Sequence, residues 1–251
     1  MSILKLIKFQ VIPDIKSIVL SNLIKYFKKD MKFLGKIGFS KLDNPHFFIH
    51  LPKCAGNSIK KYLKDNNFPT IILGHSTFYP FYKFPYEVSK SNNPNAFCVV
   101  RNPFERIVSA YFFLRKGGMN FMDEKTYNKY LSEYEDFQDF ILNGLGNNKN
   151  CKTLIEKVIH LIPQTNFLIN KDGELCVAKK NLIHLENFKK EFETYLHSLG
   201  KEYKELPWEN KSCERRNYKD EYKNNEMIDI VSEVYDKDFN ELGYSRRIVK
   251  I

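Results

Sequence analysis

Short, continuous apolar runs alternate along the chain with longer segments in which apolar residues recur every three or four positions. The first pattern predicts buried strands and the second predicts helices packed by one face. Strands are predicted at residues 46–51, 70–74, 96–101 and 181–185. Strands that alternate with helices form a largely parallel sheet covered by helices. The pattern therefore predicts an α/β fold: a single P-loop-like, three-layer domain with a mostly parallel central sheet flanked by helices.

Helical spacing follows the first and third predicted strands directly and also fills the longer intervals. One helix is predicted from Ser58 onward and another from Phe104 through Leu114. Further helices are predicted at residues 123–144 and 151–161, where they would line a substrate cleft. Residues 220–242 predict one long amphipathic helix.

The loop between the first strand and its helix has residues that suit an anion. It is His50-Leu51-Pro52-Lys53-Cys54-Ala55-Gly56-Asn57-Ser58. The first turn of a helix has backbone N–H groups without internal partners, at the positive end of the helix dipole. Lys53 adds a charge, Gly56 permits close approach of the backbone, and Ser58 adds a hydroxyl. An ordinary strand-to-helix turn is the simpler interpretation of this loop.

A second polar segment, residues 101–111, follows the third predicted strand. Arg101 ends that strand, Asn102 is suited to cap the next helix, and Pro103 suits its first turn. Arg is well suited to phosphate because its planar fork donates two parallel hydrogen bonds, and Ser109 follows two helical turns later. The simpler interpretations are a surface salt bridge for Arg101 and a small packing residue for Ser109. If the two strands are neighbours, both segments face one crevice at the sheet edge.

At these residues the chain resembles the sulfotransferases that use 3′-phosphoadenosine 5′-phosphosulfate (PAPS), in particular the glycan O-sulfotransferases that include the heparan sulfate 2-O-sulfotransferases. The family pattern H-[IVL]-P-K-[TC]-[AG]-[GS]-[TN]-S matches residues 50–58, and R-[DN]-P-x-x-R-x-x-S-x-Y matches residues 101–111. Weaker matches are Gly74-His75, Pro163-Gln164-Thr165, His184-Leu185-Glu186 and residues 234–244.

The resemblance implies a sulfuryl transfer from PAPS to a hydroxyl group of an acceptor, which in this branch is a carbohydrate. The loop residues Lys53, Cys54, Ala55, Gly56, Asn57 and Ser58 are implied to hold the 5′-phosphosulfate. Arg101 and Ser109 are implied to hold the 3′-phosphate, together with Arg216 from a basic stretch before the last predicted helix. Lys53 would also stabilise charge on the departing oxygen.

The acceptor hydroxyl must lose a proton, and histidine titrates near neutral pH without a large perturbation. His75 follows the strand predicted at 70–74. It is the expected base, because the enzymes that the chain resembles have a base in a similar Gly-His context. The simpler interpretation is a histidine that is hydrogen-bonded in a loop. We expect structural roles for His50 and His184. No metal-ligand spacing occurs among Cys, His, Asp and Glu, so metal-independent chemistry is expected.

Length and charge divide the chain into a basic segment, residues 1–41, and one domain, residues 42–251. A chain of 251 residues that is 43% hydrophobic can bury one substantial core. The first 41 residues contain nine Lys, no Arg and two Asp, a net +7 out of the total of +10. Their apolar runs are too short to span a bilayer. The segment is interpreted either as an amphipathic helix on anionic lipid or as an extra helix packed on the domain.

Five cysteines without paired spacing argue against a disulfide framework, so cytoplasmic residence is expected, with membrane-surface contact through residues 1–41. No nucleic-acid partner is expected.

Two other functions also fit part of the sequence. A nucleotide kinase would place Lys immediately before the loop hydroxyl, where this chain has Asn57. A non-catalytic, basic membrane-binding module would not explain Arg101 and Ser109.

Overall fold

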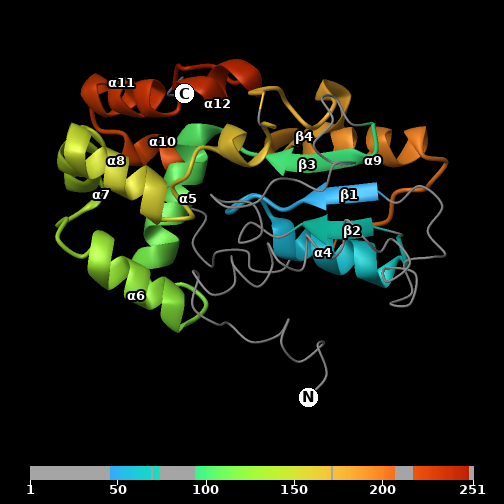
Figure 1. The fold of residues 1–251 in the computed structure, drawn as a ribbon, viewed down its shortest axis with the longest axis horizontal. Coiled ribbons are helices and arrows are strands. Elements are labelled where there is room, and N and C mark those ends of the chain that lie inside the picture. The colour runs from blue at the N-terminus through green and yellow to red at the C-terminus, as the bar shows by residue number, and fades with distance from the viewer. Residues whose placement is uncertain (1–45, 69, 74–93, 171, 207–216, 249–251) are drawn as a thin grey trace.

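Four parallel strands form the central sheet of the residues that the computed structural model describes, namely 46–68, 70–73, 94–170, 172–206 and 217–248 (Figure 1). Their spatial order is β2 (Thr70–Leu73), β1 (His46–Ile49), β3 (Ala96–Val100) and β4 (Leu182–His184). All three pairings are parallel. The predicted α/β fold, with a parallel sheet and flanking helices, is confirmed.

Two helices, α4 (Gly56–Asp65) and α9 (Phe188–Ser198), are joined to the sheet by aromatic side chains. Tyr62 of α4 lies edge-on to Phe192 of α9, with ring centroids 5.3 Å apart. Phe192 and Tyr195 in turn contact Phe97 of β3, at 6.2 and 4.8 Å. Each such pair contributes about 0.5–1.5 kcal/mol beyond the burial of its area. The helix that follows β1 is therefore fixed against the neighbouring strand.

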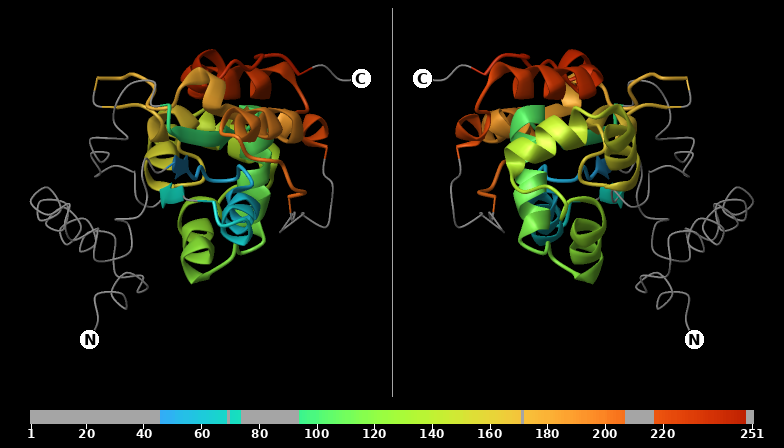
Figure 2. Two further views of the ribbon diagram at one scale, coloured as in Figure 1. Left: turned by 90° about the vertical axis from the view of Figure 1, so that its right-hand side faces the viewer. Right: turned by 90° about the vertical axis from the view of Figure 1, so that its left-hand side faces the viewer.

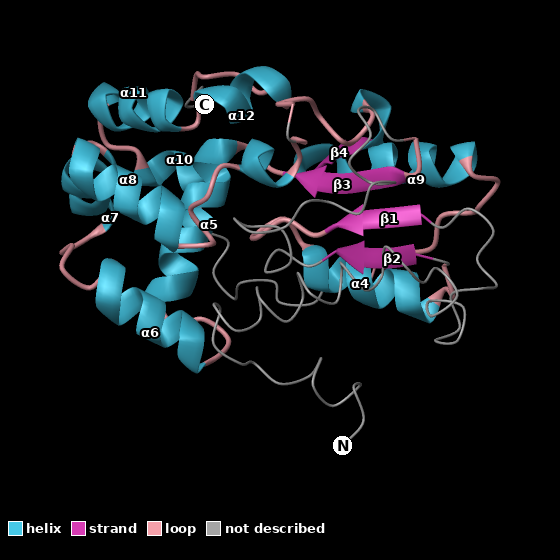
Figure 3. Cartoon of the chain, in the orientation of Figure 1, coloured by secondary structure: helices cyan, strands magenta, loops and turns pink. Residues whose placement is uncertain are grey.

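A second core lies beyond the carboxyl ends of the strands, which point toward it in Figure 3. Its centre is α5 (Pro103–Arg115), whose Phe104, Ile107 and Tyr111 are fully buried. As the sequence predicts, the Asn102 side chain accepts a hydrogen bond from the backbone N–H of Phe104 and Pro103 occupies the first turn. The other helices of this region are α6 (Phe121–Tyr130), α7 (Phe137–Asp139), α8 (Asn148–Lys157), α10 (Tyr218–Glu221), α11 (Asn225–Val234) and α12 (Asp236–Glu241).

The prediction of one long helix over residues 220–242 is wrong, because the segment forms α10, α11 and α12. Tyr222 lies between the first two, where its hydroxyl donates to the carbonyl of Phe104 at 3.0 Å. Asn224 then starts α11 by accepting from the N–H of Met227 at 3.0 Å. A short polar side chain that binds the backbone in this way competes with a continuous helix. Figure 2 shows these C-terminal helices, coloured red, along one side of the molecule.

The helix predicted at residues 123–144 is also interrupted. It ends at Tyr130, and α7 begins only where Asp136 accepts from the N–H of Asp139 at 2.8 Å. A π-helical turn, Phe140–Leu145, then completes the segment. The apolar period continues across these breaks, so periodicity alone does not locate them.

None of the helices in the described part of the chain is both long and apolar enough to cross a membrane. The basic segment at residues 1–41 lies outside the described residues, so its two interpretations stay predictions.

His184, at the end of β4, joins three elements. Its Nδ1 lies 2.9 Å from the Glu191 carboxylate of α9, and its Nε2 lies 2.9 Å from the carbonyl oxygen of Leu242, just after α12. Burial alone would lower the pKa of His184, but the Leu242 carbonyl and the Glu191 carboxylate outweigh it and raise the pKa above its usual value. These contacts fit the structural role expected for His184.

His184→Gln should destabilise the protein in a pH-dependent way. A histidine whose pKa is higher in the folded state contributes its full stabilisation below the unfolded pKa of about 6.5, and loses it as the pH rises through the folded pKa. The difference in unfolding free energy between wild type and variant should therefore be larger at acidic pH than at alkaline pH. Urea unfolding across this range measures it, and a pH-independent difference would contradict the linkage.

Candidate functional site

The loop after β1 and the first residue after β3 lie side by side at the carboxyl edge of the sheet. β1 and β3 are neighbours, with Ile49 opposite Cys98. Arg101 Nη1 donates to the carbonyl oxygen of Lys53 at 3.1 Å. The two segments that the sequence singles out therefore meet, as ligand sites of open α/β sheets do, at the ends of adjacent strands.

The N-terminus of α4 has no side-chain cap and no acidic residue in its first turn. The preceding residue, Ala55, has a left-handed backbone with φ of 54°, and Lys53 has φ of 66°. Such conformations are uncommon for residues other than glycine and often occur at ligand-binding sites. This turn presents backbone N–H groups and a positive dipole end, which favour an anion.

Gly56 is required here by a neighbouring side chain. A Cβ at this position would lie 1.7 Å from Cδ2 of His50. His50 is buried and stacks on Phe48, with ring centroids 5.9 Å apart. The packed position expected for His50 is thus present, and the sequence argument that assigned Gly56 only to the approach of a ligand missed this contact.

Lys53 extends along one face of α5. Its Nζ lies 3.5 Å from the centroid of the Phe113 ring, a distance at which ammonium and ring attract each other. Burial and the nearby charge of Arg101 lower the pKa of Lys53 to about 8, while the Asp123 carboxylate offsets part of this effect. Ser109 lies one helical turn before Phe113 and is partly exposed.

Arg101 makes the salt bridge that the simpler interpretation predicts, yet it keeps an unused donor. Its Nη2 lies 2.8 Å from Oε1 of Glu105, and the Arg101 side chain is 18% exposed. Its Nε has no hydrogen-bond partner among the described residues. Arg101 lies two residues before the first residue of α5, Pro103, and Ser109 lies within that helix.

Two loop residues place their side chains inward. The Cys54 thiol lies 3.4 Å from Oε1 of Gln164, and burial raises its pKa to about 12. Cys54 can therefore contribute only its backbone to an anion, and its thiol is a poor nucleophile. Ser58 is buried at the start of α4. Asn57 lies at the rim, where its Nδ2 is 3.8 Å from the sulfur of Met119.

His75 and Arg216 lie outside the described residues, so their predicted roles stay predictions. Within the described ranges, no group of three or more His, Cys, Asp or Glu side chains is arranged to hold a metal ion.

A comparison with known families agrees with this geometry. The model of the sulfotransferase family matches residues 41–245, most of the chain. The chain belongs to the sulfotransferase family. No curated protein and no solved structure matches the chain. The resemblance of this sulfotransferase to the glycan branch stays a prediction.

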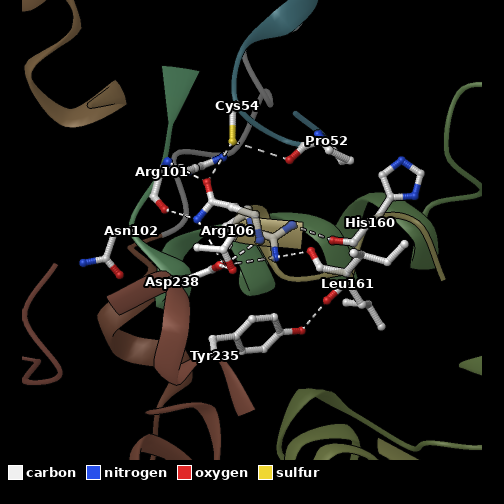
Figure 4. Close-up of polar contacts among 12 residues, drawn as sticks. Pro52, Cys54, Arg101, Asn102, Arg106, His160, Leu161, Tyr235 and Asp238 are labelled. Carbon is white, nitrogen blue, oxygen red and sulfur yellow. Dashed lines mark hydrogen bonds and ion pairs between the residues drawn. The ribbon is translucent and has the colours of Figure 1, made fainter. Parts of the chain in front are cut away.

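Sequence reasoning missed a buried polar network beneath the site of this sulfotransferase (Figure 4). Arg106 is fully buried and donates to the carbonyl oxygens of His160 and Ile162 at 3.1 and 2.8 Å. Its Nη2 lies 4.0 Å from the carboxylate of Asp238, which is also fully buried. Arg106 is the second arginine of the 101–111 motif, and its position on the apolar face of α5 indicated a buried role. Its partners could not be predicted, because they are distant in sequence.

Lys53 should acylate at an unusually low pH for a lysine. Only the neutral amine reacts, so limited labelling with an amine-reactive reagent, quantified by peptide mass spectrometry, should give a midpoint near pH 8. Arg101→Gln removes a neighbouring positive charge and should move this midpoint upward. A wild-type midpoint at the ordinary lysine value of about 10.4 would contradict the burial argument.

Proposed function

We propose that this sulfotransferase transfers a sulfuryl group from PAPS to a hydroxyl group of a carbohydrate acceptor. The observation that carries the proposal is the contact between Arg101 Nη1 and the Lys53 carbonyl, 3.1 Å long. It joins two segments that each suit an anion, and PAPS has anionic groups at its 5′ and 3′ ends. A nucleotide with both groups can occupy both segments at once.

The hydrogen-bond donors and positive charges of the site fit such a nucleotide. The α4 N-terminus is uncapped, so the loop from Lys53 to Ser58 would hold the 5′-phosphosulfate through its backbone N–H groups and the Lys53 ammonium. Arg101, whose side chain is partly exposed just before α5, and Ser109 of α5 would hold the 3′-phosphate. We propose Arg216 as a further 3′-phosphate contact.

Transfer in line with the acceptor oxygen builds negative charge on the oxygen that leaves with the nucleotide. Lys53 and the N–H groups at the start of α4 are suited to stabilise this charge, because fixed donors in a partly buried site act more strongly than water. We propose His75 as the base that removes the acceptor proton.

Exposed apolar side chains near the anion loop support an acceptor with a ring face, such as a sugar. Met119, in the connection between α5 and α6, is 65% exposed, and Phe121, the first residue of α6, is 73% exposed. The contact of Met119 with Asn57 places this connection at the rim of the loop. Large exposed apolar groups of this kind often mark binding surfaces. A cytoplasmic location with lipid contact through residues 1–41 belongs to the same proposal.

Calorimetric titration should show that 3′-phosphoadenosine 5′-phosphate binds more tightly than AMP or ATP. The expected gain over AMP is about 1–3 kcal/mol, the scale of charge-assisted hydrogen bonds to one added phosphate. Arg101→Gln should remove most of this gain and leave AMP binding nearly unchanged. Arg115→Gln, at the exposed C-terminal end of α5, is the matched control. Equal affinities of wild type for the bisphosphate and AMP would defeat the proposal.

His75→Ala should abolish turnover while the affinity for 3′-phosphoadenosine 5′-phosphate is unchanged, because a base acts on the acceptor and not on the nucleotide. Release of the bisphosphate from PAPS in the presence of a panel of glycans measures turnover. His197→Ala, an exposed position on α9, controls for the loss of an imidazole. Full activity of His75→Ala would exclude His75 as the base.

A further inference from the structure

The side chain of Gln164 contacts both anion-suited segments. Its Oε1 accepts from the N–H of Arg101 at 2.9 Å and from the Cys54 thiol at 3.4 Å. Its Nε2 donates to the carbonyl oxygen of Arg101 at 2.8 Å. One side-chain amide therefore pairs with both main-chain groups of the residue that follows β3, and reaches the loop that follows β1.

Gln164 is itself held rigidly. The Asp238 carboxylate accepts from the Gln164 N–H at 2.7 Å, and from the N–H and hydroxyl of Thr165 at 2.8 Å each. Gln164, Thr165 and Asp238 are all fully buried. A satisfied buried network of this kind fixes the geometry of its members. The amide is thus a fixed link between the two segments.

We infer that Gln164 is a positioning residue that sets the spacing between the Lys53 loop and Arg101. The inference rests on the proposed function, in which one nucleotide occupies both segments. A ligand with two anionic groups gains from the second group only when both sites are correctly spaced, as with any linked pair of binding sites. Displacement of one segment then reduces joint binding, while each segment alone still binds its own anion. Small misplacements of this kind can have large effects.

A second buried amide, which contacts the other end of β3, separates positioning from mere stability. Asn181 is buried, and its Nδ2 donates to the carbonyl oxygens of Pro94 and Ala96 at 2.8 and 3.0 Å. These contacts lie at the start of β3, whereas Gln164 contacts its end. Loss of either amide removes buried hydrogen bonds, but only Gln164 touches the anion-suited segments.

The experiment compares Gln164→Met with Asn181→Leu, since both replacements keep the side-chain size and remove its hydrogen bonds. Thermal unfolding reports stability, and calorimetry gives the affinities for 3′-phosphoadenosine 5′-phosphate and for AMP. Gln164→Met should lower the ratio of bisphosphate to AMP affinity by about tenfold, while AMP affinity stays within about twofold of wild type. Asn181→Leu should lose stability and keep the wild-type ratio.

Gln164→Asn is the second variant, and it keeps an amide one methylene too short for both segments; its ratio should also fall. A wild-type ratio in both Gln164 variants, or an equal fall in Asn181→Leu, would overturn the inference. Absence of any preference for the bisphosphate in the wild-type protein would instead overturn the proposed function on which the inference rests.

Discussion

The parallel pairing of β1 with β3 is the constraint on which the candidate site depends. Parallel neighbours end at the same edge of a sheet, so the segments that follow them must start side by side. The loop before α4 and the start of α5 are therefore neighbours, although Lys53 and Arg101 are 48 residues apart. The aromatic contacts of Tyr62 in α4 with Phe192 in α9, and of Phe192 with Phe97 in β3, hold the sheet and helices in this arrangement.

Two positively charged side chains, Lys53 and Arg101, lie at the candidate site, where a bound anion would complement their charge. Lys53 and Arg101 lie close enough for the charge of Arg101 to lower the Lys53 pKa. Beneath them, Asp238 and Arg106 are buried near Gln164, and their hydrogen bonds offset the cost of removing charges from water. This network joins the core centred on α5 to the core formed by the sheet with α4 and α9. The position of the site therefore depends on how these two cores pack.

Local patterns were sufficient for the parts of the structure that depend on a few adjacent residues. Continuous apolar runs located the strands, and Asn102 with Pro103 located the start of α5. The motif around Lys53 and Arg101 led to the family, which the match to residues 41–245 confirms. Periodicity failed at Asn224 and Asp136, where a single side chain captures the backbone and restarts a helix.

The sequence by itself thus determined the strand-loop-helix units and the residues suited to an anion. Only the tertiary structure decided which side chains face the site: Gly56 makes room for His50, Cys54 turns inward, and Gln164 contacts Arg101 across 63 residues of sequence. The physical reason is the distance along the chain over which each interaction acts. Propensity and capping act within a helical turn, whereas these contacts depend on how the two cores pack together.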